Sequence, residues 1–184
     1  MKVEVPNRLS KFYDSPAGFE IIIPAKRNYF YITFLGFWIM GWVVAEVWVI
    51  DMLISWNSGT EYSKIFLYSW LGAWTAGGVF SIYFWLWMAI GKEIIILNEM
   101  ALSIKRDILG FGRTYEYVLN HINNMRYSAP GHTAYDFETG MSIIGIRGGL
   151  IAFDYGARTF RFGASIDEVE AKDIILEINR RHQF

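Results

Sequence analysis

The chain of 184 residues contains no cysteine. This absence excludes disulfide bonds, thiolate nucleophiles, iron–sulfur clusters and zinc sites with cysteine ligands. An excess of charge of one sign is also lacking, because 17 lysines and arginines face 18 aspartates and glutamates, for a net charge of −1. Proteins that bind nucleic acid usually carry a basic field, so no nucleic-acid partner is expected.

Charged residues are scarce in one part of the chain. Residues 29–91 carry four charged side chains, whereas residues 92–184 carry 23. All eight tryptophans lie in or beside the charge-poor part, and none follows Trp87. The chain is therefore predicted to have two compositional units, and the second is long enough to form one small core.

The charge-poor part contains two long apolar runs. Residues 29–50 are interrupted only by Glu46, and residues 65–91 are uncharged between Lys64 and Lys92. An α-helix rises about 1.5 Å per residue, so about 20 residues cross a hydrocarbon core of ~30 Å. Both runs reach that length, which predicts a hairpin of two transmembrane helices.

These runs divide the chain into parts. We expect a cytoplasmic N-terminal segment at 1–28, transmembrane helices at about 29–51 and 65–91, and a soluble domain at 92–184. The first segment has no long apolar stretch, so it is not expected to be a cleavable signal peptide. Its residues 20–27 (Glu-Ile-Ile-Ile-Pro-Ala-Lys-Arg) are predicted either to add a strand to the soluble domain or to lie on the membrane surface.

Basic residues near the ends of the two spans predict the orientation of the hairpin. Lysine and arginine are enriched in the cytoplasmic flanks of membrane proteins. The loop at 52–64 contains only Lys64. The other flanks contain Lys2, Arg8, Lys11, Lys26 and Arg27 before the first span, and Lys92, Lys105 and Arg106 after the second. Both termini are therefore expected in the cytoplasm, with the loop outside.

The two apolar runs share a pattern of tryptophans four residues apart with small residues between them. Its members are Trp38, Gly41 and Trp42 in the first run, and Trp70, Gly72 and Trp74 in the second. Small residues let membrane helices approach closely, so the pattern indicates either packing within the hairpin or a surface for another transmembrane protein. Eight tryptophans exceed what one hairpin needs, which favours other integral membrane proteins as partners.

Glu46 is the one ionisable residue well inside a span. Such a group normally faces protein or water, because its transfer into lipid is unfavourable. One interpretation is a proton relay or a hydrogen-bond acceptor between subunits. The other is that Glu46 lies near Asp51 at the outer interface and reaches water. Neither span contains histidine, so no side-chain histidine ligand for haem or chlorophyll is offered there, and no cofactor is expected.

Residues 92–184 contain short segments that alternate between apolar and polar residues, which is typical of strands. The expected strands are 93–97, 102–105, 114–119, 121–128, 141–146, 150–154 and 159–162, with a long loop at 129–140. Ser165 and Glu168 form an S-x-x-E capping box before a helix that ends with Arg180 and Arg181. The predicted fold is an α+β membrane protein, in which the hairpin precedes a small antiparallel β-barrel or sandwich with a C-terminal helix.

One stretch of the soluble domain carries a resemblance to a known family. Residues 149–163 read Gly-Leu-Ile-Ala-Phe-Asp-Tyr-Gly-Ala-Arg-Thr-Phe-Arg-Phe-Gly, and an acidic helix start with Glu170, Ala171 and Ile174 follows. This order resembles the bacterial pleckstrin-homology-like (bPH) domain, which follows transmembrane hairpins in similar membrane proteins. The resemblance implies a PH-like fold in the inner membrane of a bacterium, with a role in oligomerisation, scaffolding or assembly.

Residues with catalytic or binding chemistry are few. The three histidines, at 121, 132 and 182, match no metal motif, and no nucleotide or nucleophile motif occurs. We therefore expect no metal site and no catalytic residue. Arg147, Arg158 and Arg161 are interpreted either as a patch that faces anionic lipid or an acidic partner, or as a solvated face of a sheet.

Three functional hypotheses follow from these observations. The first is a non-enzymatic accessory or scaffold subunit that packs on a larger integral membrane complex, for instance a respiratory or photosynthetic one. The second is a PH-like membrane scaffold or regulator that assembles with copies of itself. The third is an enzyme or transporter that uses Glu46, although two helices cannot form a transport path without oligomerisation.

Overall fold

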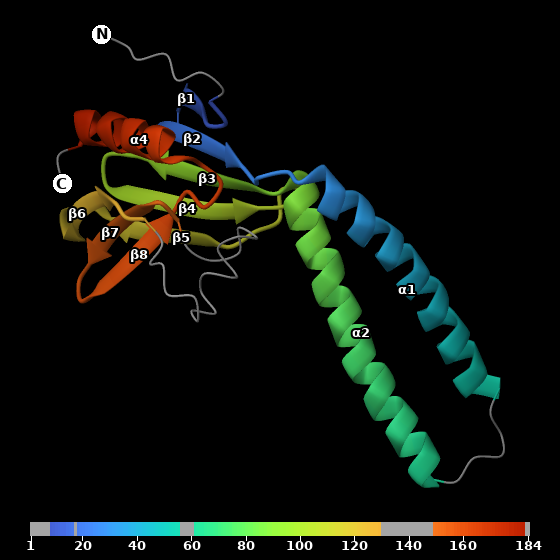
Figure 1. The fold of residues 1–184 in the computed structure, drawn as a ribbon. Coiled ribbons are helices and arrows are strands. Elements are labelled where there is room, and N and C mark those ends of the chain that lie inside the picture. Colours follow the sequence, from blue (N-terminus) through green and yellow to red (C-terminus); the bar gives the residue numbers. More distant parts are fainter. Residues whose placement is uncertain (1–7, 17, 56–60, 130–148, 183–184) are drawn as a thin grey trace. The chain divides into compact units, whose positions relative to one another are not determined.

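The structure is a computed structural model that describes residues 8–16, 18–55, 61–129 and 149–182 (Figure 1). It divides into two compact units. The chain up to Lys26 and from Ile90 onward forms one unit, which we call the β unit, and Arg27–Ala89 forms the other, which we call the helical unit. The helical unit is thus inserted into the sequence of the β unit.

The helical unit consists of α1 (Tyr29–Ser55) and α2 (Glu61–Ile90). Both helices are long enough and apolar enough to cross a membrane, by the criteria of length and composition. Their apolar residues are spread all round the helix rather than along one stripe, which is unlike a surface helix of a soluble protein. The two predicted helices are confirmed, and each extends a few residues further toward the connecting loop than expected.

Five antiparallel strands form the larger sheet of the β unit. They are β1 (Lys11–Ser15), β2 (Gly18–Pro24), β3 (Lys92–Leu97), β4 (Ala101–Asp107) and β5 (Thr114–Val118), in that spatial order. β2 and β3 pair directly, although α1 and α2 separate them in the sequence. The Ala25 amide also donates to the Gly91 carbonyl over 2.9 Å. The sequence predicts a separate N-terminal segment at 1–28, but the structure has two strands there that belong to the larger sheet. This agrees with the strand alternative for residues 20–27.

One face of this sheet is buried in the core. Phe19, Ile21 and Ile23 of β2 point to it, and Ile95 and Leu97 of β3 lie beside them, while the residues between are only partly buried. This is the two-residue alternation of a strand with one covered face.

The smaller sheet is formed by β6 (Ile122–Tyr127), β7 (Ile151–Tyr155) and β8 (Arg158–Phe162). A 3₁₀ turn at Leu119–His121 leads into it, so His121 is not the strand residue that the sequence predicts. No strand pairing joins the two sheets within the described parts of the chain, so the barrel is not closed. The α+β class is confirmed. Of the barrel and sandwich alternatives, the described strands form two separate sheets and no closed barrel. The expected strand at 141–146 lies outside the described residues.

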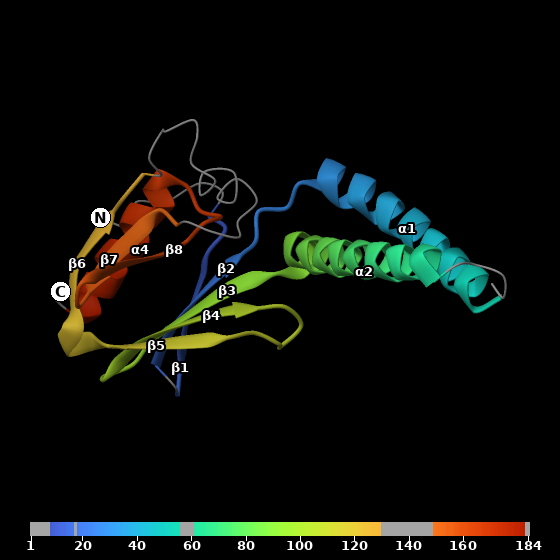
Figure 2. The ribbon, with the colours of Figure 1, turned by 90° about the horizontal axis from the view of Figure 1, so that it is seen from below.

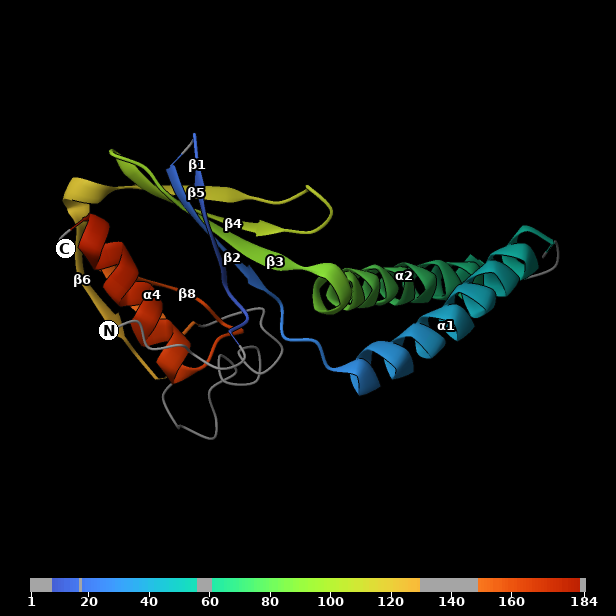
Figure 3. The same cartoon turned by 90° about the horizontal axis from the view of Figure 1, so that it is seen from above.

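The C-terminal helix α4 (Glu168–Arg181) lies beside β1 and β6, between the two sheets (Figures 2 and 3). Its inner face buries Ala171, Ile174 and Ile178 completely. A helix covers the space that strand pairing would otherwise close, which explains why the sheets stay separate while their core is continuous.

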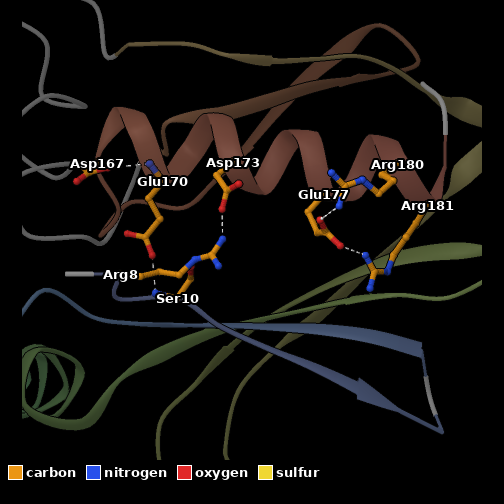
Figure 4. Close-up of polar contacts among 8 residues, drawn as sticks. All are labelled: Arg8, Ser10, Asp167, Glu170, Asp173, Glu177, Arg180 and Arg181. Carbon is orange, nitrogen blue, oxygen red and sulfur yellow. Dashed lines mark hydrogen bonds and ion pairs between the residues drawn. The ribbon is translucent and has the colours of Figure 1, made fainter. Parts of the chain in front are cut away.

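Polar contacts hold α4 to the segment that leads into β1 (Figure 4). Asp173 pairs with Arg8, and the buried Glu170 carboxylate accepts from the Ser10 amide. The N-cap is Asp167, whose side chain accepts from the Glu170 amide over 2.8 Å. The predicted capping box is therefore wrong in position, because the Ser165 hydroxyl instead accepts from the Lys26 amide.

Asp154 joins all three strands of the smaller sheet. Its carboxylate accepts from Arg126 over 2.9 Å, from Thr159 over 2.7 Å and from Asn124 over 2.9 Å. The Arg126 hydrogen bond, followed by those of Thr159 and Asn124, lowers the pKa of Asp154 to about 2. Hydrogen bonds to the charged form of a carboxyl favour that form.

This lowered pKa predicts a pH-dependent contribution to stability. A carboxyl with a depressed folded pKa stabilises the fold above its unfolded pKa, and the contribution is lost as the pH falls through the folded value. The unfolding midpoint of wild type should therefore exceed that of Asp154→Asn at pH 7, and the difference should shrink from about pH 4 toward about 2. Denaturant titrations across this range test it, and a difference independent of pH would contradict it.

Candidate functional site

The interior of the hairpin contains a polar contact surrounded by apolar residues. The Thr75 hydroxyl of α2 donates to Oε1 of Glu46 in α1. Glu46 is only 8% exposed, and its Oε2 atom has no hydrogen-bond partner among the described residues. The structure therefore does not place Glu46 in water near Asp51. It makes Glu46 an acceptor within the chain, joining the two helices.

Tryptophan side chains pack onto glycines at two further points between the helices. A Cβ atom at Gly78 would lie 2.0 Å from a ring carbon of Trp42, so only glycine fits beneath this indole. A Cβ atom at Gly36 would approach Trp85 to 3.3 Å, and the Trp85 indole donates to the Ile32 carbonyl over 2.8 Å. These contacts, with Glu46–Thr75, hold the hairpin together.

The glycines of the shared tryptophan pattern do not lie at these contacts. A Cβ atom at Gly41 or at Gly72 would meet nothing within 4 Å. Of the four pattern tryptophans only Trp42 is buried, whereas Trp38, Trp70 and Trp74 are each more than a third exposed. Trp70 and Trp74 stack on each other, with ring centroids 5.2 Å apart. The pattern thus divides into one packing residue and an exposed aromatic surface.

Of the residues in the hairpin contacts that the sequence analysis did not single out, only Thr75 carries a signal in the sequence. Thr75 is one of three hydroxyl residues of the serine and threonine type in the second apolar run, with Ser69 and Ser81, and in a hairpin it lies at a depth similar to that of Glu46. Polar residues in membrane helices tend to pair with each other. Gly78 and Trp85 carry no such signal, because glycine and tryptophan recur throughout both helices.

The three arginines of the predicted anion patch are not brought together. Arg158 and Arg161 are both exposed on β8, but they are three residues apart, and side chains at an odd spacing in a strand point to opposite faces. Arg161 donates to the Ser128 carbonyl over 3.4 Å. Arg147 lies outside the described residues. The described pair therefore fits the solvated-sheet interpretation better than a common patch.

Three buried carboxylates of the β unit each have an internal partner. Glu170 accepts from Ser10, as described above. Glu93 is 3% exposed and accepts from the Gly163 amide over 2.8 Å and from Arg106 over 3.3 Å. Buried charges are tolerated when they are paired in this way, so these groups are assigned to the fold.

Asp107, the third, holds the turn between β4 and β5. Its carboxylate contacts the Lys105 ammonium at 2.7 Å and accepts from the Gly110 amide over 3.2 Å. The hydrogen bond from Lys105 lowers the pKa of Asp107, despite the opposing effect of burial. Lys105 also donates to the Gly110 carbonyl over 2.9 Å, so both peptide groups of this glycine are fixed.

The turn that Asp107 holds has an unusual composition. Ile108 and Phe111 exchange backbone hydrogen bonds, and Leu109 and Gly110 between them both have positive φ, at 53° and 91°. Such turns prefer asparagine or glycine, and a residue with a Cβ in the left-handed region loses roughly 1–2 kcal/mol. Leu109 and Phe111 are nevertheless large apolar residues, 72% and 83% exposed. We call Ile108–Phe111 the apolar tip.

An open pocket of about 650 Å³ lies at the other end of the larger sheet. Arg181 lines it, together with parts of the β1–β2 and β3–β4 turns. Its guanidinium lies 3.6 Å above the Phe19 ring, pairs with Asp14 over 3.3 Å and pairs with Glu177. Among the described residues that line this pocket, Arg181 is the one lysine or arginine, and its guanidinium is already paired.

The described residues hold no group of three or more histidines, aspartates or glutamates that could bind a metal ion. His121 is exposed beside Tyr155, and His132 lies outside the described residues. Comparisons of the chain with protein-family models, with curated proteins and with solved structures gave no match. The functional conclusion below therefore depends on the sequence and the geometry of this chain.

Proposed function

We propose that this protein is a non-enzymatic, membrane-anchored accessory or scaffold subunit that packs on a larger integral membrane complex. The observation that carries the proposal is the outer surface of the hairpin. Phe34, Val44 and Trp48 of α1 are 61%, 70% and 65% exposed, and α2 presents similar residues. A soluble protein rarely leaves so large an apolar surface uncovered. Lipid and partner helices are the surroundings that suit it.

The stacked pair Trp70 and Trp74 is the part of this surface best suited to a partner. Lipid alone places no demand on two indoles held face to face, whereas tryptophan is enriched where proteins bind one another. The pair lies outside the Trp42, Thr75 and Trp85 contacts that hold the hairpin together, so it is available to another transmembrane chain.

The topology and the family resemblance belong to the same proposal. Lys26, Arg27 and Lys92 flank the hairpin on the side of the β unit, and this supports a cytoplasmic position for the β unit and both termini. The inner membrane of a bacterium is what the resemblance implies. Two antiparallel sheets with a C-terminal helix agree with what a bPH-like domain implies. A self-assembling PH-like scaffold is the second candidate, favoured by the same exposed helices.

Mild extraction from native membranes tests the proposal. The full chain should co-migrate on native gels with stoichiometric amounts of unrelated integral membrane proteins, which mass spectrometry identifies. Trp70→Leu/Trp74→Leu should release those partners, because leucine keeps the span apolar but removes the stacked surface. The matched control, Phe80→Leu/Tyr83→Leu, alters exposed aromatic residues on other faces of α2 and should retain them. A particle that contains only this chain would overturn the proposal in favour of self-assembly.

A further inference from the structure

The register of the larger sheet determines at which end the apolar tip lies. Lys92, the first residue of β3, pairs with Asp107, the last residue of β4, and Pro24 at the end of β2 pairs with Lys92. The tip follows Asp107 directly. It therefore lies at the end of the sheet where the chain leaves toward α1 and returns from α2, as the β4–β5 connection in Figure 3 shows.

The tip also extends beyond the last strand pair. Strands rise about 3.3 Å per residue, so Leu109 reaches roughly 7 Å past the Lys92–Asp107 pair. On the neighbouring strand, the same distance corresponds to Gly91 and Ile90, where α2 ends. The tip and the point at which β3 follows α2 therefore lie at the same end of the sheet, at a similar distance along its strands.

The construction of the tip favours exposure of these side chains. The Gly110 amide donates to Asp107, and the Gly110 carbonyl accepts from Lys105. The backbone hydrogen bonds between Ile108 and Phe111 close the turn. Leu109 keeps a left-handed backbone that asparagine or glycine would adopt more easily. Strained backbone that the surrounding structure holds in place is a pointer to function.

The charges beside the tip agree with an interfacial position. Arg113 is exposed two residues after Phe111, and Lys92 and Lys105 lie at the same end of the sheet. The positive charges of Lys105 and Lys92 are partly neutralised by Asp107, so this end of the sheet is only moderately basic. Apolar side chains with basic residues nearby suit the boundary between acyl chains and lipid headgroups.

We propose that the apolar tip inserts Leu109 and Phe111 into the lipid interface beside the transmembrane hairpin, as a third attachment of the β unit to the membrane. This inference rests on the proposed membrane insertion of α1 and α2. Its ligand is the bilayer itself rather than a protein groove, because both side chains belong to a tight turn and are 72% and 83% exposed.

The absence of cysteine makes a direct test available. Single variants Phe111→Cys, Met100→Cys and Val44→Cys of the full chain are labelled with an environment-sensitive fluorophore. They are then reconstituted in vesicles of equal parts phosphatidylcholine and phosphatidylglycerol, with and without quenchers attached to the acyl chains. Met100 is the matched control, since it is 78% exposed in the turn at the opposite end of the same sheet. Val44 reports on the hairpin.

The expected result is lipid quenching at positions 44 and 111 that is severalfold stronger than at position 100. Leu109→Asn in the labelled Phe111→Cys background should weaken the quenching at position 111 while relaxing the turn. Quenching at 44 without quenching at 111 would overturn the tip insertion and leave the membrane hairpin intact. No quenching at either position would overturn both. A blue shift at 111 without lipid quenching would overturn it in favour of a protein contact.

Discussion

Glu93→Ala is expected to lower the free energy of unfolding of the β unit by about 2–3 kcal/mol. The Glu93 carboxylate lies on the core face of β3 and accepts from the Gly163 amide, which joins the larger sheet to the segment between β8 and α4. Its removal leaves that buried amide without an acceptor and removes one partner of Arg106. The Arg106 side chain is about a third exposed, so its ion pair with Glu93 is screened by water. Most of the lost stability is therefore expected from the unpaired Gly163 amide.

Denaturant titration and hydrogen exchange measure this effect. The midpoint should fall, and the Gly163 amide should exchange faster than in wild type. Glu93→Gln should lose less, because its amide oxygen can still accept from Gly163. Glu116→Ala is the control, since Glu116 is exposed on β5, and a surface change of this kind is worth within about 0.5 kcal/mol. Equal midpoints for Glu93→Ala and Glu116→Ala would show that Glu93 does not join the two parts.

Gly78→Val is expected to open the hairpin contact at a cost of about 1–3 kcal/mol. Its Cβ would lie 2.0 Å from the Trp42 ring, so the indole or the helix must move. A shift there also disturbs the neighbouring hydrogen bond between Thr75 and Glu46. In a membrane, helices associate through close packing and hydrogen bonds rather than through exclusion of water, so both losses act on the same interface.

Gly77→Val provides a matched control. Gly77 precedes Gly78 in the same helix, but a Cβ atom there meets nothing within 4 Å. Unfolding in mixed detergent micelles, followed by near-ultraviolet circular dichroism, should show a lower midpoint for Gly78→Val only. Adding Trp42→Ala to Gly78→Val should restore part of the loss by making room. Equal effects at the two glycines would contradict the role of Trp42 in the interface.

Some features could be read from local chemistry. The two long helices follow from apolar runs long enough to span a membrane, and β3, β4 and α4 follow from short-range periodicity. A helix that ends with Arg180 and Arg181 was also expected, and both arginines pair with Glu177. These features depend on neighbours within a few residues, where the sequence order and the spatial order are nearly the same.

Other features depend on partners far away in the chain. β2 and β3 are separated by the whole helical unit, so the sequence suggests two domains in tandem where the structure has one inserted in the other. The N-cap residue also differs from the prediction. The Ser165 hydroxyl accepts a hydrogen bond from the distant Lys26 amide, and Asp167 caps α4 instead. Local propensity ranks such candidates, but a distant hydrogen bond selects between them.

By itself, the sequence determined the composition of the two units, the two helices and the strand-rich character of the remainder, because these follow from residue type and local period. Only the tertiary structure decided which face of each isoleucine run is buried. Residues 21–23 and 94–96 are each three consecutive isoleucines, so alternation cannot choose a face, and it is the packing of the two sheets and α4 that buries Ile21, Ile23 and Ile95. The same packing placed Glu93 inward, whereas helix–helix packing selected Gly78 rather than Gly41 or Gly72 as the contact point.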